Sequence, residues 1–232
     1  MELILDQKPR NVTIIEGFPG FGLVSTIATE YLITHLDARQ IGKITLEEMP
    51  PVVAVHSGQI IEPIGVFYSK KYNLVILHAL TSVTGFEWKV ADKVAELAKL
   101  LQAKEIVCIE GVGSNTQSTN AFYLSEKFAT KVKKSTKLQE LKEGIIMGVS
   151  GALMLNKKLP VTCIFAETHS QLPDSRAAAK IIESLDQYLG LKVDIKPLLK
   201  KAEEFEEKIK GIMDQSKEAM TTKQKKELSY LG

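Results

Sequence analysis

Short runs of apolar residues alternate along the chain with segments in which apolar residues recur every three or four positions. The runs predict buried strands at residues 11–15, 64–68, 74–80, 105–109 and 161–166. The helical periodicity predicts one helix that ends near residue 35, one that spans 90–101 and one that spans 174–189. Strands that alternate with helices are typical of β-α units, so we expect an α/β fold with a mostly parallel sheet flanked by helices.

Turn and cap residues mark the ends of several of these elements. Only a short lysine-rich turn, residues 70–73, separates the second strand from the third. We therefore expect an antiparallel hairpin there, at one edge of the sheet. Asp174 follows a proline and is a favourable N-cap for the last of the three helices. Gly190 is placed to end that helix.

The last forty residues have a different pattern from the rest of the chain. Apolar residues recur there in alternating steps of four and three, which is a heptad seam: Leu198, Ala202, Phe205, Ile209 and Ile212. Such a helix either packs on its own domain or joins subunits, and for the second case we expect oligomerisation through Leu198, Phe205, Ile209 and Ile212. The polar segment beyond Met220 predicts a flexible tail. The predicted organisation is an α/β domain at residues 1–195, a helical extension at 196–220 and a tail at 221–232.

Composition narrows the class of protein. The chain has 232 residues, of which 44% are hydrophobic, and its net charge is +2 from 30 basic and 28 acidic residues. A near-neutral charge with few arginines argues against nucleic-acid binding. No stretch is long and apolar enough to cross a membrane, and the start lacks the pattern of a signal peptide. The two cysteines lie inside apolar runs, which favours a reducing compartment, so we expect a cytoplasmic protein.

Two glycine-rich loops directly follow predicted strands. The first contains Gly17, Gly20 and Gly22 in the sequence GFPGFG, and the second spans residues 111–116. Their spacing is not that of dinucleotide-binding loops, and Glu16 would repel a phosphate. These glycines either approach a ligand or permit a tight turn from strand to helix. The GVSGA sequence at 148–152 lacks the last glycine of a nucleophile elbow and favours helix packing through small residues.

Acidic residues and a histidine come just after the predicted strands. The candidates at this edge of the sheet are Glu16, Glu110, Glu167 and His169, beside the three glycines of the first loop. The carboxyl ends of parallel strands meet at a crevice, where carboxylates and a histidine can perform acid-base chemistry. One interpretation is a hydrolase or transferase that handles nucleoside or acyl groups; the other is that polar residues end most strands. The four histidines are far apart and no metal-binding spacing occurs, so we expect no metal site.

Three segments together resemble the proteasome assembly chaperone 2 family. They are GFPGFGLVS at residues 17–25, IIMGVSGALM at 145–154 and AETHSQLPDSRAAAKIIESL at 166–185. Their order and spacing are similar to the family over roughly residues 10 to 195, and the archaeal members look most similar. The resemblance implies a phosphorylase-like α/β sandwich and a non-enzymatic, homo-oligomeric chaperone without a cofactor. The implied partner is the proteasome core particle or its α-subunits.

The resemblance also implies a role for the end of the tail. Members that bind α-subunits often end in a hydrophobic residue, a tyrosine and any residue. Here Tyr230 is third from the end instead of second, followed by Leu231 and Gly232. We expect these three residues to bind the partner with Leu228 as a further apolar contact, and several tails on one oligomer to raise the effective concentration.

Overall fold

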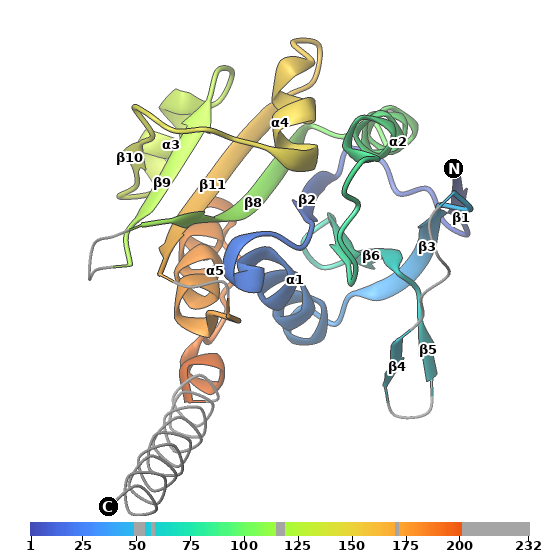
Figure 1. Cartoon of the computed structure of the whole chain (residues 1–232), viewed down its shortest axis with the longest axis horizontal. Coiled ribbons are helices and arrows are strands. Elements are labelled where there is room, and N and C mark those ends of the chain that lie inside the picture. Colours follow the sequence, from blue (N-terminus) through green and yellow to red (C-terminus); the bar gives the residue numbers. More distant parts are fainter. Residues whose placement is uncertain (49–53, 57–58, 115–118, 170–171, 201–232) are drawn as a thin grey trace, which may run out of the picture.

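The computed structural model describes residues 1–48, 54–56, 59–114, 119–169 and 172–200 (Figure 1). The elements in chain order are β1 (Glu2–Leu5), β2 (Thr13–Gly17), the 3₁₀ helix η1 (Phe21–Leu23), α1 (Val24–His35), β3 (Arg39–Thr45), β4 (Ala54–His56), β5 (Gln59–Ile61), β6 (Ile64–Ser69), β7 (Leu74–Ala79), α2 (Glu87–Leu100), β8 (Glu105–Gly113), β9 (Ala121–Ser125), α3 (Ala129–Ser135), β10 (Gln139–Glu140), α4 (Gly148–Leu155), β11 (Val161–Thr168) and α5 (Ser175–Leu189).

Nine strands form one mixed sheet in the order β1-β3-β6-β7-β2-β8-β11-β9-β10. The four central strands β7, β2, β8 and β11 are parallel to one another. The pairs β1–β3, β3–β6, β6–β7 and β11–β9 are antiparallel. The α/β class is confirmed, but the expectation of a mostly parallel sheet was wrong. The predicted hairpin of β6 and β7 is confirmed, although it lies inside the sheet and not at an edge, because β3 and β1 continue the antiparallel pairing beyond it.

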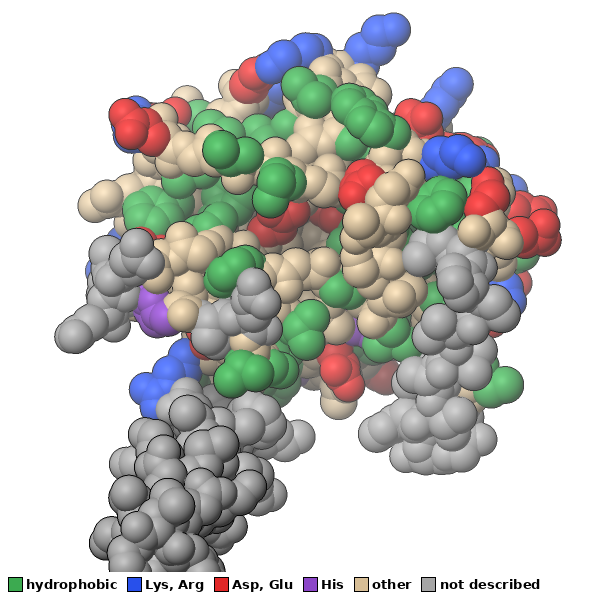
Figure 2. Space-filling view, viewed as in Figure 1, with side chains coloured by type: hydrophobic (Ala, Val, Ile, Leu, Met, Phe, Trp, Pro, Cys, Tyr) green, Lys and Arg blue, Asp and Glu red, His purple; other side chains and the backbone are tan. Residues whose placement is uncertain are grey.

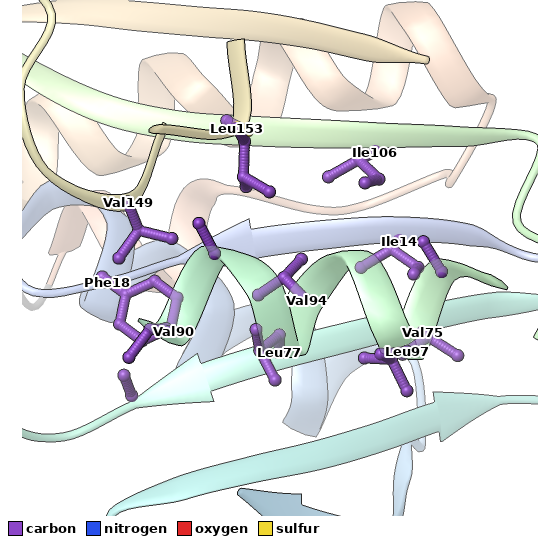
Figure 3. Packing of buried hydrophobic residues seen from close by; sticks show 14 of the residues in the cluster. Ile14, Phe18, Val75, Leu77, Val90, Val94, Leu97, Ile106, Val149 and Leu153 are labelled. Atoms are coloured by element: carbon purple, nitrogen blue, oxygen red, sulfur yellow. The ribbon is translucent and has the colours of Figure 1, made fainter. Parts of the chain in front are cut away.

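Helices cover both faces of the sheet (Figure 1). Helices α1 and α5 pack side by side on one face, and α2 and α4 pack side by side on the other. The predicted apolar stripe of α2 accounts for its position, since Val90, Val94 and Leu97 are fully buried. Figure 3 shows these three side chains grouped with Val75 and Leu77 of β7 in one buried cluster. In the part of the chain that the structure describes, no helix combines the length and apolar character needed to cross a membrane.

The predicted limits of α5 are confirmed. The Asp174 carboxylate accepts a hydrogen bond from the backbone N–H of Ala177 at 2.9 Å, which is an N-cap contact. Gly190 ends the helix in the left-handed conformation at φ 69°, which glycine adopts without steric cost. These caps fix the start of α5 close to the end of β11.

The chain turns helical again at residues 196–200, where the extension was expected to begin. Leu198 is only 5% exposed and belongs to the core between the sheet and the α1/α5 layer. The first residue of the predicted seam therefore packs on its own domain. Phe205, Ile209 and Ile212, together with the tail residues Leu228, Tyr230, Leu231 and Gly232, lie outside the described residues.

Candidate functional site

A cavity of about 710 Å³ lies beside the carboxyl ends of β2 and β8. Its walls come from residues 18–21 after β2, residues 82–87 before α2, the end of β8, and residues 139–149, which lead into α4. Figure 2 shows acidic side chains deep in this hollow and hydrophobic side chains around it. The edge of the sheet that the sequence indicated is therefore the hollowed one.

Two of the predicted carboxyl groups lie on neighbouring strands, one in the lining of the cavity and the other buried outside that lining. Glu16 on β2 pairs in register with Cys108 on β8, and Glu110 follows two residues later on the same face of β8. Glu16 is 1% exposed and is not among the described residues that line the cavity, whereas Glu110 lines it. The hydroxyl of Ser150, on α4, donates a hydrogen bond to Oε2 of Glu16 at 3.3 Å. The sequence brought both glutamates forward as candidates, but it did not connect Ser150 with them.

Burial changes the acidity of this pair. Desolvation raises the pKa of Glu16 to about 8, and the nearby charge of Glu110 adds to the rise. Desolvation also raises the pKa of Glu110 to about 7. Hydrogen bonding by Ser150 lowers the pKa of both carboxyl groups, but it does not offset burial. Near neutral pH the pair therefore holds protons that exposed carboxylates would have released.

The other predicted residues have different surroundings. Glu167 on β11 also lines the cavity, and its carboxylate accepts hydrogen bonds from Ser114 Oγ at 3.0 Å and from Asn120 Nδ2 at 2.7 Å. His169 lies on the surface, with Nδ1 3.2 Å from the backbone oxygen of Ser114. It is not among the described residues that line the cavity. The structure therefore joins Glu16 and Glu110 with Ser150 and leaves His169 apart from them.

The glycines of the first loop are explained largely by packing. A Cβ atom on Gly17 would lie 2.8 Å from Cγ2 of Thr29 on α1, so only glycine lets β2 approach that helix so closely. Gly22 has φ +64°, and a Cβ atom there would lie 2.7 Å from the Thr168 hydroxyl. Gly20 lines the cavity, and an added Cβ atom would have no neighbour closer than 3.9 Å. The tight-turn interpretation therefore accounts for Gly17 and Gly22, and only Gly20 is open to a ligand.

The second glycine-rich segment, whose first residues form the end of β8, provides a test of this packing. A Cβ atom on Gly111 would lie 2.3 Å from the backbone oxygen of Phe21, whereas one on Gly113 would meet only the Phe21 ring at 3.5 Å. We expect Gly111→Ala to lower the free energy of unfolding by about 1–3 kcal/mol, because the backbone at η1 must move. Gly113→Ala is the matched control with a much smaller effect. Urea denaturation of both variants measures the difference, and equal stabilities would contradict the packing described.

The described part of the chain shows no metal centre. Within the described residues, no group of three or more His, Cys, Asp or Glu side chains is placed to hold a metal ion. His78, the buried histidine of β7, has its Nδ1 2.8 Å from the hydroxyl of Thr29 on α1. Burial lowers its pKa to about 4, so His78 is neutral and joins β7 to α1.

Comparison with known proteins finds a matching family, solved structures of the same fold and related sequences. The sequence model that describes the PAC2 family matches residues 14–213 of this chain. The structure of Pyrococcus furiosus PbaA, described as an archaeal homolog of proteasome-assembly chaperone, is similar with a TM-score of 0.84 and 28% identity, over 97% of this chain and 96% of that one. P. furiosus PbaB, described as an archaeal proteasome activator, has the same fold at 20% identity with a TM-score of 0.80, over 91% and 98%. An uncharacterized Methanocaldococcus jannaschii protein, MJ0106, is 25% identical over 95% of this chain and 93% of its own length.

Proposed function

The chain belongs to the PAC2 family, and from this premise we propose that it is a cytoplasmic, non-enzymatic chaperone that binds proteasome α-subunits and assists core-particle assembly. The observation that carries the proposal is the match over residues 14–213, which includes all three segments that resemble the proteasome assembly chaperone 2 family. The similarity to PbaA over nearly the full length of both chains supports it.

The surroundings of the candidate polar residues support a role without catalysis. Nucleophilic catalysis needs a nucleophile, a base within hydrogen-bond reach and a group that orients the base. In the described part of the chain, Ser150 donates to a carboxyl group and contacts no histidine. His78 is bonded to Thr29, and His169 is bonded to a backbone oxygen. The residues offered for a hydrolase or transferase therefore do not form such a set.

This proposal predicts that assembly does not depend on the polar residues at the strand ends. Glu110→Gln and His169→Ala should each leave the yield of core particles within about twofold of the wild-type yield, because neither residue belongs to a complete catalytic set. Native gel electrophoresis of particles assembled with each variant measures the yield. A loss of assembly in either variant, in a protein that remains folded, would favour the enzymatic interpretation.

We further propose that the chaperone is a homo-oligomer in which Phe205, Ile209 and Ile212 join subunits. Leu198 is already buried in its own domain, so the seam available to a partner begins after it. The tail residues Leu228, Tyr230, Leu231 and Gly232 are the proposed contact with α-subunits. Several tails on one oligomer would bind together, which raises avidity without any new type of contact.

The proposal is tested by affinity purification of the tagged chain from its native cytosol. We expect proteasome α-subunits to co-elute in a stable ratio, as measured by quantitative mass spectrometry. An untagged strain carried through the same purification is the control for background. Recovery of α-subunits no higher than in this control would overturn the proposal.

A further inference from the structure

We propose that the cavity is a binding site for a small organic cation, an amine or guanidinium with an apolar body, whose charged group lies on the carboxyl group of Glu110. This site is separate from the proposed contact with the proteasome. The inference depends on how the buried glutamates are partnered, on the walls of the cavity and on its charge.

The buried glutamates elsewhere in the described structure have strong partners. Glu105, at the start of β8, is 2% exposed and lies 2.9 Å from the ammonium of Lys131. Thr162 and Tyr188 donate hydrogen bonds to its other carboxylate oxygen at 2.7 and 2.5 Å. Glu167 accepts hydrogen bonds from Ser114 and Asn120. Each of these carboxylates is thus stabilised by a cation or by several donors, as burial of a charge requires.

Within the described residues, Glu16 and Glu110 have weaker partners, chiefly the hydroxyl of Ser150. Neither carboxyl group forms an ion pair with any lysine or arginine of the described residues. Glu16 receives one hydrogen bond of 3.3 Å from Ser150 and weak support from the thiol of Cys108. Nearby carboxyl groups that have no cationic partner either keep their protons or bind a cation that is not part of the chain. At Glu110 the cavity provides the space for such a cation, whereas Glu105 is paired with Lys131 of the chain itself.

The walls of the cavity suit the apolar part of such a ligand. Its volume of about 710 Å³ falls within the range of small-molecule sites, roughly 300–1,000 Å³. Phe18, Phe21 and Phe122 line it, and aromatic rings bind both apolar groups and cations. Ile145 and Met147 also line it and are 86% and 75% exposed.

The charge around the cavity favours a cation over an anion. Besides Glu110, the charged side chains that line it are Glu87, Glu140, Lys142, Glu143 and Glu167. The single lysine is 2.8 Å from Glu140 and is therefore neutralised locally. An inorganic cation is a poorer match, since no group of three suitable ligands occurs among the described residues. An organic cation needs only one or two carboxylates and an apolar wall, and both are present.

Protons held by the pair give the site a specific signature. Glu16 of β2 and Ser150 of α4 lie near Glu110. The other charged residues that line the same cavity are Glu87, Glu140, Lys142, Glu143 and Glu167. Because burial raises the pKa of Glu110 to about 7, part of the population is protonated at neutral pH. A bound cation favours the ionised carboxylate and must release that proton. Binding should therefore be accompanied by proton release at pH 7 and should weaken as the pH falls below 7.

The test uses isothermal titration calorimetry of the full chain with phenethylamine, and with 2-phenylethanol as the neutral probe of similar shape. At pH 8 we expect saturable binding of phenethylamine with a Kd below about 1 mM, and binding of 2-phenylethanol at least about tenfold weaker. Glu110→Gln should reduce the affinity for phenethylamine at least about tenfold, because it removes a charged hydrogen-bond acceptor. Glu30→Gln, on the exposed surface of α1 and outside the cavity lining, is the matched control and should change it less than about threefold.

Titrations at pH 7 in two buffers with different ionisation enthalpies measure proton release by the wild-type protein. Equal affinity for the amine and the alcohol, equal loss in the two variants, or no saturation at about 10 mM phenethylamine would each overturn the proposal. Core-particle assembly with Glu110→Gln distinguishes the cation site from the proposed chaperone function. Loss of amine binding with normal assembly supports both proposals. If the wild-type chain does not bind α-subunits, the chaperone proposal fails, and the calorimetry still decides whether the cation site exists.

Discussion

Removal of residues 228–232 is expected to abolish the retention of proteasome α-subunits by this chain. The removed segment contains Leu228, Tyr230 and Leu231, the apolar side chains of an otherwise polar tail. A tyrosine provides a large rigid contact surface and one hydroxyl at low entropic cost, which suits a small pocket. Tyr230→Ala alone should cost about 1–3 kcal/mol per tail, as is common for aromatic anchors. Pull-down of α-subunits by the wild type, the truncation and the single variant measures both effects.

Two controls make this prediction specific. Ser229→Ala changes a neighbouring residue of the same tail without removing an apolar anchor, so it should retain α-subunits like the wild type. Circular dichroism and thermal unfolding of the truncated chain should match the wild type, since the core described above lies within residues 1–200. Equal recovery of α-subunits with and without residues 228–232 would show that the body, and not the tail, binds them.

Glu16→Gln is expected to stabilise the protein, and the gain should grow with pH. Burial raises the pKa of Glu16 from 4.5 to about 8, so the folded state keeps a proton that the unfolded state releases. The contribution of Glu16 to the free energy of unfolding must therefore fall as the pH rises from about 4.5 to about 8 and then level off. Glutamine does not ionise and avoids this loss. At about 1.4 kcal/mol per pKa unit, the upper limit of the gain above pH 8 is about 5 kcal/mol.

Urea denaturation at intervals from pH 5 to pH 9 measures this gain. The difference between Glu16→Gln and the wild type should be small near pH 5 and largest near pH 9. The shifts of Glu110 and His78 are present in both proteins, so they largely cancel in the difference. Glu143→Gln, on the surface, serves as the control for loss of one negative charge. A gain that does not vary with pH would contradict the assigned burial and protonation of Glu16.

The elements that the sequence predicted well are those fixed by neighbours along the chain. The apolar stripe of α2 and the Asp174 and Gly190 caps of α5 are local signals, and the structure contains them. Strand pairing is not local, since β3 pairs with β6 and β1 across intervening segments. The periodicity within a strand does not indicate which strand it pairs with. The mixed character of the sheet was missed for this reason.

The candidate site, too, was predicted where the signal is local and missed where it depends on distant residues. That Glu16 and Glu110 lie near each other on neighbouring strands was predictable because parallel strands end at a common edge. Their position just past the strands was wrong, because β2 continues to Gly17 and β8 to Gly113. The contact of Ser150 with Glu16 joins residues 134 positions apart. The sequence drew attention to Ser150 through GVSGA and the segment IIMGVSGALM, but neither pattern indicated Glu16 as its partner. His169 directly follows a strand, as a residue of the candidate site should, yet its ring contacts the backbone oxygen of Ser114 and not the two glutamates. Side-chain direction just past a strand depends on the loop, which the sequence pattern does not specify.

Reconstitution of proteasome core particles from purified α- and β-subunits, followed by native mass spectrometry with and without this chain, tests the proposed chaperone role most directly. The account predicts complexes that contain the chain together with α-subunits early in the reaction, and a higher yield of complete core particles when the chain is present. An unchanged yield, with no complex that contains both the chain and an α-subunit at any time point, would contradict it.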